Sequence, residues 1–192
     1  MRSQFKFALA LVAGVLATPV TAQTASRADL EAFLNTQVAN WVRDASLVSA
    51  VKEQNEAHSR YTQAHLEALD MIWRGEAVLG QGGIVDEVLS HPLSSGLQGK
   101  VLFSGGKVIE VFVMDNKGLN VGSTGMTSDY WQGDEAKFQQ TFGRGAGSIH
   151  IGDIEFDDSA NRYIAQLSMT VVDPQTGQAI GAITVGVDAS KF

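Results

Sequence analysis

Apolar residues in the first half of the chain follow a helical pattern. Between residues 26 and 74 they recur every three or four positions, and this segment contains no proline and no glycine. That spacing predicts a helix, and Ser26 followed by Asp29 resembles a capping box with Asp in place of Glu. The pattern fits one helix of about 45 residues, longer than is usual in globular proteins, or two helices broken near residues 44–46. We favour the single long helix, within a segment that spans residues 23–75.

Residues 76–192 form the rest of the predicted domain, and their pattern changes from irregular to β. The passage from Gly75 to Gly106 is rich in glycine, with a helical turn that ends before Pro92. Beyond it, β-branched and apolar runs predict strands, and residues 115–118 predict a hairpin turn in which Gly118 takes a positive φ. The predicted strands cover residues 108–114, 119–123, 148–156, 162–172 and 179–187, with a helix over residues 134–142. This order of elements predicts an α+β fold.

The first 22 residues have the three parts of a secretory signal. Arg2 and Lys6 precede an apolar run over residues 7–16, and small residues follow up to Ala22. We expect cleavage after Ala22 and a periplasmic mature protein. A retained N-terminal anchor is the alternative, although the apolar run is shorter than the roughly 20 residues that span a bilayer.

Charge and cysteine content exclude several classes of partner and site. Removing residues 1–22 leaves 170 residues, about one domain, and changes the formal net charge from −7 to −9. An acidic chain without a basic stripe is not expected to bind nucleic acid or an anionic membrane surface. The chain has no cysteine, which excludes disulfides, thiolate metal sites and a cysteine nucleophile. We expect no cofactor and no metal.

An aromatic and acidic cluster at residues 127–135 is the strongest candidate for a binding site. Asp129, Tyr130, Trp131 and Asp134 lie where a loop should lead into the predicted helix. Free N–H groups at a helix N-terminus suit a carboxylate, acids suit an amine, and the rings suit a cation. Each residue also has a structural explanation, because the rings suit core packing and Asp134 suits an acid beside a helix end.

Four further candidates come from neighbouring elements. Trp73 and Arg74 lie near the end of the predicted long helix, Asp115 begins the hairpin turn, and Tyr163 lies on the penultimate predicted strand. Arg74 could instead pair with Glu76 at the surface, and Asp115 could only form the turn. Tyr163 suits a pocket or the core equally well.

Several segments resemble a single Cache (PDC) sensor domain, and together they extend over nearly all of the expected mature chain. The segments are residues 69–74, residues 113–121, residues 127–135 and residues 181–188. The resemblance implies a PAS-like, five-stranded antiparallel sheet with a loop and helix inserted after the second strand. It also implies a small ligand, often an amino acid or a carboxylate, bound between the sheet and this insertion. Such domains usually control a transmembrane kinase, chemoreceptor or cyclase. This sequence stops at Phe192, so we expect a free-standing periplasmic protein.

Two functions remain open, and catalysis is not among our expectations. The first is binding of a small metabolite, an amino acid, amine or carboxylate, by the cluster at residues 127–135. The second is a protein-interaction module whose long helix docks on a membrane sensor or on a second copy of the chain. No nucleophile, base and metal set accompanies the acids, so we do not expect an enzyme.

Overall fold

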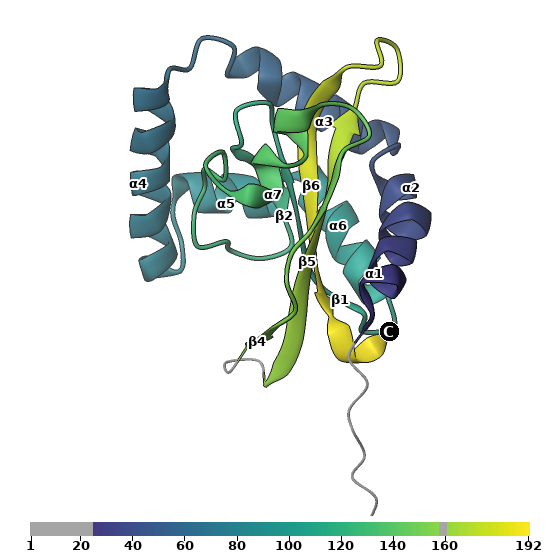
Figure 1. Ribbon diagram of the computed structural model, residues 1–192. Helices are drawn as coiled ribbons and strands as arrows, with labels where there is room; N and C mark the ends of the chain where they lie inside the picture. The colour runs from purple at the N-terminus through teal and green to yellow at the C-terminus, as the bar shows by residue number, and fades with distance from the viewer. Residues whose placement is uncertain (1–24, 158–160) are drawn as a thin grey trace, which may run out of the picture.

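A computed structural model describes residues 25–157 and 161–192 (Figure 1). The predicted signal peptide and its cleavage site lie outside these residues. The described part is an α+β domain in which helices surround a PAS-like antiparallel sheet, so the predicted fold class is confirmed. Within these ranges no helix is both long enough and apolar enough to cross a bilayer.

The N-terminal helix is not continuous, so the preferred single helix is wrong. It divides into α1 (Arg27–Phe33), a π-helical segment η1 (Leu34–Val38), α2 (Ala39–Trp41), α3 (Ala45–Ala57) and α4 (Gln63–Leu79). The predicted capping box of Ser26 and Asp29 is present at the start of α1.

Two N-caps explain where the chain turns. Asp44 is extended and accepts a hydrogen bond from Ser46 N–H, so it begins a new helix, α3, at the break that was the alternative prediction. A second break was not predicted. There Thr62 caps α4 through a box that His65 completes, and α4 turns away from α3.

The passage expected to be irregular contains two helices, α5 (Gly83–Ser90) and α6 (Pro92–Leu102). The predicted end before Pro92 is confirmed, but a second helix starts there at once. Pro92 occupies the first turn of α6, where a missing N–H costs nothing, and the His91 ring accepts a hydrogen bond from Leu93 N–H.

Within the described residues the sheet has six strands, one more than expected. They are β1 (Val108–Met114), β2 (Asn120–Ser123), β3 (Ile149–Ile151), β4 (Glu155–Asp157), β5 (Arg162–Val172) and β6 (Ala179–Asp188). Their order is β2-β1-β6-β5-β3, all antiparallel, and β4 also pairs with β5. The extra strand arises because the strand predicted over residues 148–156 is divided into β3 and β4.

The insertion between β2 and β3 is mostly loop. The helix expected over residues 134–142 is reduced to α7 (Ala136–Gln139) and a 3-10 turn, η2 (Phe142–Arg144). The hairpin before it is as predicted, with Gly118 at φ 87° and its N–H bonded to Asp115 O at 3.1 Å.

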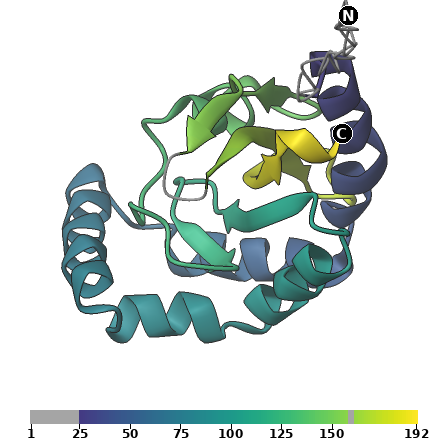
Figure 2. The same cartoon turned by 90° about the horizontal axis from the view of Figure 1, so that it is seen from below.

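Helices cover the sheet and extend beyond one side of it (Figures 1 and 2). The main core joins α1–α3 and α6 to the strands, while a second cluster joins α4 and α5 to Leu119 and Tyr130. A small third cluster packs Phe138 of α7 against Phe112. The final turn, η3 (Ala189–Lys191), lies beside α1, where Ala25 N–H donates to Ala189 O at 2.8 Å.

Candidate functional site

Asp70 connects α4 to the loop that carries the aromatic and acidic cluster at residues 127–135. The sequence analysis did not identify Asp70 as a candidate. One carboxylate oxygen, Oδ1, accepts hydrogen bonds from Tyr130 N–H at 2.9 Å and from Trp131 N–H at 3.1 Å. The other oxygen accepts from Arg74 Nε at 2.8 Å. Asp70 is only 7% exposed. Its carboxylate accepts hydrogen bonds from two backbone N–H groups that have no other acceptor in the described residues. Its position four residues before Arg74 was the signal that could have identified it.

Arg74 holds two carboxylates of this network. Besides Asp70, its Nη2 lies 2.8 Å from Asp129 Oδ1, and these acids raise the pKa of the guanidinium, Asp70 most strongly. The alternative pairing with Glu76 is not what the structure shows. Glu76 instead accepts from Ile84 N–H and Val85 N–H, each at 2.9 Å, and so caps α5.

Trp73 and the loop aromatics make structural contacts. The Trp73 ring is fully buried and stacks on Tyr130 at 5.3 Å, while its Nε1–H donates to Thr127 O. Trp131 is partly buried, and its Nε1–H donates to Lys117 O at 2.8 Å, so the ring fastens the loop to the β1–β2 hairpin. The contacts of Trp131 within the described residues are therefore those of a residue that packs in the structure.

Asp115 is fully buried and fully occupied. Its Oδ1 accepts from Lys117 N–H and Leu119 N–H, which shapes the turn as the alternative explanation predicted. Its Oδ2 accepts from Gln54 Nε2 at 3.0 Å and lies 2.9 Å from His58 Nδ1. The carboxylate thus positions His58, and it has little capacity left for a ligand.

A small cavity of about 170 Å³ lies next to this network. It is bounded by α3, α4, α5, β2 and the loop at residues 127–135. Its lining residues are Gln54, His58, Tyr61, Leu69, Ile84, Glu87, Val88, His91, Val121 and Tyr130. Tyr130 is 6% exposed, and its hydroxyl makes no hydrogen bond to any residue that the structure describes. Burial raises the pKa of Tyr130, and the negative charges of Asp115 and Glu87 raise it further. The cavity therefore combines an unused hydroxyl with a negative potential.

Two predicted site residues lie elsewhere. Asp134 is exposed and precedes Glu135, the N-cap of a four-residue helix, so it does not lie within a first helical turn. Tyr163 contacts Phe156 edge-to-face at 5.1 Å and lines a separate surface pocket with Arg162 and Asp188. Across residues 25–157 and 161–192, no three His, Asp or Glu side chains are placed to hold a metal ion.

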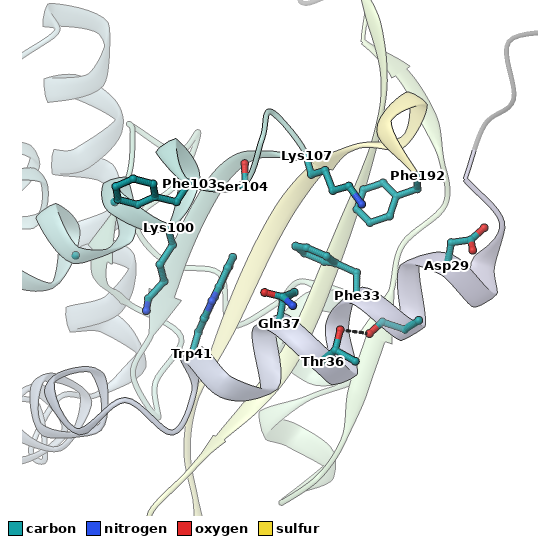
Figure 3. Close-up of a pocket in the computed structure, with 13 residues that line it drawn as sticks. Asp29, Phe33, Thr36, Gln37, Trp41, Lys100, Phe103, Ser104, Lys107 and Phe192 are labelled. Atoms are coloured by element: carbon teal, nitrogen blue, oxygen red, sulfur yellow. Dashed lines mark hydrogen bonds between the residues drawn. The ribbon is translucent and has the colours of Figure 1, made fainter.

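A larger, open groove of about 810 Å³ lies away from the cavity, between α1–α2 and α6 (Figure 3). Its walls carry four aromatic rings, Phe33, Trp41, Phe103 and Phe192. The sequence analysis did not identify this groove, because its walls come from helices that lie far apart in the sequence.

Comparisons with known proteins give only distant structural neighbours. No family model and no curated protein matches the sequence. The ligand-binding domain of the Campylobacter jejuni chemoreceptor Tlp3, in complex with 4-methylisoleucine, is 14% identical with a TM-score of 0.40, over 82% of this chain and 62% of that one. The V. cholerae histidine kinase DctB sensor domain is 10% identical with a TM-score of 0.34, over 74% and 56%.

A third neighbour is the ligand-binding domain of the Pseudomonas fluorescens chemoreceptor CtaA in complex with L-serine. It is 12% identical with a TM-score of 0.37, over 65% of this chain and 58% of that one. The chain thus spans about three fifths of the length of these neighbours. They are sensor or ligand-binding domains of chemoreceptors and of a histidine kinase.

Proposed function

We propose that this chain is a small-molecule-binding domain of the sensor type, and that its site is the cavity beside Tyr130. The observation that carries the proposal is the Tyr130 hydroxyl, which belongs to a side chain that is 6% exposed, lines the cavity and has no hydrogen-bond partner in the described residues. A bound ligand would supply the missing partner.

The residues around the cavity favour an amine over a carboxylate. None of the described residues that line it is Lys or Arg, whereas Glu87 is an acid. The carboxylates of Glu87 and Asp115 act together on the Tyr130 hydroxyl. A negative potential attracts an ammonium group and repels an anion. Of the three expected ligand classes, we therefore select a small amine.

The two cavity histidines present complementary nitrogens. His58 directs Nδ1 toward the Asp115 carboxylate, so a neutral His58 carries its proton there and leaves Nε2 as an acceptor. His91 accepts from Leu93 N–H through Nδ1, so a neutral His91 has a donor at Nε2. His58 Nε2 and the Glu87 carboxylate can then accept from the N–H groups of an ammonium. The cavity volume, about that of six water molecules in the liquid, limits the ligand to a few non-hydrogen atoms.

A thermal shift screen of the mature chain from Gln23 tests this proposal. It compares small primary amines with the N-acetyl derivatives of the same amines and with carboxylates of matched size. An amine at about 100 times its Kd should add about 2.7 kcal/mol to the free energy of unfolding, and the acetylated compound should add nothing. The same amine should stabilise Glu87→Gln less than the parent chain. Stabilisation by carboxylates alone, or by no compound, would contradict the proposal.

Export to the periplasm is part of the same proposal. It rests on the charged, apolar and small-residue parts of residues 1–22. N-terminal sequencing of the protein recovered from the periplasm should begin at Gln23. A protein that keeps residues 1–22 and fractionates with membranes would instead support the retained anchor.

The outer face of α4 supports a second candidate function, self-association. Met71, Val78 and Leu79 are 75%, 88% and 75% exposed, and Ile72 is 49% exposed. Met71 and Val78 belong to a stripe with the spacing of a helix–helix seam, which consists of Ala64, Ala68, Met71, Gly75 and Val78. Figures 1 and 2 both show α4 at the side of the domain opposite α1, where an outer face can meet another molecule.

Sedimentation velocity tests this second candidate across a range of protein concentrations. Self-association that Met71→Glu or Val78→Glu abolishes would support an interface on α4. The matched control is Leu102→Glu, because Leu102 is an equally exposed residue, at 76%, on another helix. A parent chain that stays monomeric at every concentration would exclude the candidate.

A further inference from the structure

The groove between α1–α2 and α6 has a wall that the π-helical segment arranges. Four residues at intervals of four, Asp29, Phe33, Gln37 and Trp41, line it from this side. Residues four apart drift around an α-helix, because one turn takes about 3.6 residues. The wider π-turn of η1, which lies between Phe33 and Trp41, offsets that drift. In Figure 3, Phe33, Gln37 and Trp41 accordingly point from one helix into the same space.

The facing wall, on α6, is kept open by two glycines. Gly96 and Gly99 both line the groove, and a Cβ added at either position would meet no atom within 4 Å. Neither has a positive φ, so the backbone does not require glycine there. Glycine inside a helix is less stable than other residues. The described fold therefore gives no reason for these glycines, and their effect is to leave room above α6.

The lysines of the groove determine the charge that it can accept. Lys100 lies over the Trp41 ring, 5.6 Å from its centroid, and Lys107 lies over the Phe192 ring at 4.6 Å. The chain's own ammonium groups thus already occupy the sites where a cationic ligand would bind these rings. Lys100 also pairs with Asp44 at 3.3 Å. Lys107 has no carboxylate within salt-bridge distance in the described residues, and the nearest acid that its charge acts on in the groove is Asp29.

We propose that this groove is a second binding site, for an amphipathic organic anion with a flat apolar body. The body lies against Phe33 and Trp41 in the space that Gly96 and Gly99 leave, and the anionic group meets Lys107. The volume of about 810 Å³ is within the range of small-molecule sites. The site is separate from the cavity beside Tyr130 and takes the opposite charge, so it does not depend on the proposed amine function.

Isothermal titration calorimetry of the mature chain with 2-naphthoate tests the proposal, with the neutral 2-naphthamide as the comparison. Naphthoate should bind, and naphthamide should bind more weakly. Lys107→Gln should weaken naphthoate binding up to about fivefold, the size expected for one partly exposed ion pair, and leave naphthamide binding unchanged. Equal affinity for the two compounds, or no binding of naphthoate, would overturn the proposal.

A second variant separates loss of the site from loss of the fold. Gly99→Gln places a side chain in the groove, so naphthoate binding should weaken at least about tenfold. Because the substitution also replaces a helical glycine, the melting temperature should not fall. Gly125→Gln is the control, since Gly125 lies outside the groove and has no atom within 4 Å of an added Cβ. It should bind naphthoate like the parent chain. If Gly99→Gln also binds like the parent, the groove is not the site.

Discussion

The backbone N–H of Tyr130 donates to the carboxylate of Asp70 at 2.9 Å, across 60 positions of the chain. This bond, with its neighbour from Trp131, determines where the loop lies relative to α4. It is a positioning interaction, because Asp70 itself does not line the cavity. The loop, and with it the Tyr130 ring, depends on a carboxylate that lies outside the cavity.

Replacing Asp70 should therefore destabilise the domain strongly. Asp70→Ala leaves two N–H groups without an acceptor and Arg74 without one of its carboxylates. We expect a loss of about 2–4 kcal/mol in the free energy of unfolding, measured by urea denaturation. Asp134→Ala is the control, because Asp134 is exposed, and it should change stability by less than about 0.5 kcal/mol. Equal effects of the two variants would show that Asp70 does not anchor the loop.

Gly118 is expected to tolerate no side chain. It has a φ of 87°, and a Cβ there would lie 2.7 Å from the backbone of Gly133. Gly118→Ala places a side chain on a residue with left-handed φ and brings its Cβ into a clash with the Gly133 backbone. It should therefore lower the free energy of unfolding by more than about 1–2 kcal/mol. Gly125→Ala, at a loop glycine with free space around an added Cβ, should cost far less. The comparison of the two melting temperatures checks this, and a stable Gly118→Ala would contradict the turn geometry.

Asp173 should contribute to acid sensitivity. Hydrogen bonds from Gln175 N–H and from Lys52 hold the pKa of its carboxyl below the ordinary value. The folded state therefore binds this proton less readily than the unfolded state. The contribution of Asp173 to the free energy of unfolding is complete above the ordinary carboxyl pKa of about 3.9 and is lost as the pH falls below it. Melting temperatures of Asp173→Asn should fall less steeply with acidification than those of the parent chain. Parallel curves would show that Asp173 has no such role.

The β half of the fold could be predicted because its signals are local. The apolar runs that become β1, β5 and β6 need only their own sequence to be identified, and Gly118 marks the hairpin by itself. The helix breaks were harder, because the periodic pattern continues across both of them. Only Asp44 and Thr62, as caps, mark the two starts.

The site could be predicted only in part, because its contacts join distant segments. Tyr130 lines the cavity, and Trp73 and Arg74 contact its loop. Asp70 was missed because its partners are backbone N–H groups, which carry no signal in the sequence. The cavity lining from His58 and Glu87 was missed for a similar reason, since α3 and α5 meet only in the folded chain.

The most direct test of the central proposal removes one oxygen atom from the cavity. Tyr130→Phe keeps the ring that stacks on Trp73 and deletes only the hydroxyl that lacks a partner in the described residues. Tyr163→Phe is the matched control, because Tyr163 lines a different pocket. We predict that an amine which stabilises the parent chain binds Tyr163→Phe equally well and Tyr130→Phe about tenfold more weakly in calorimetry. Equal binding by Tyr130→Phe and the parent would contradict the proposal that this cavity is the ligand site.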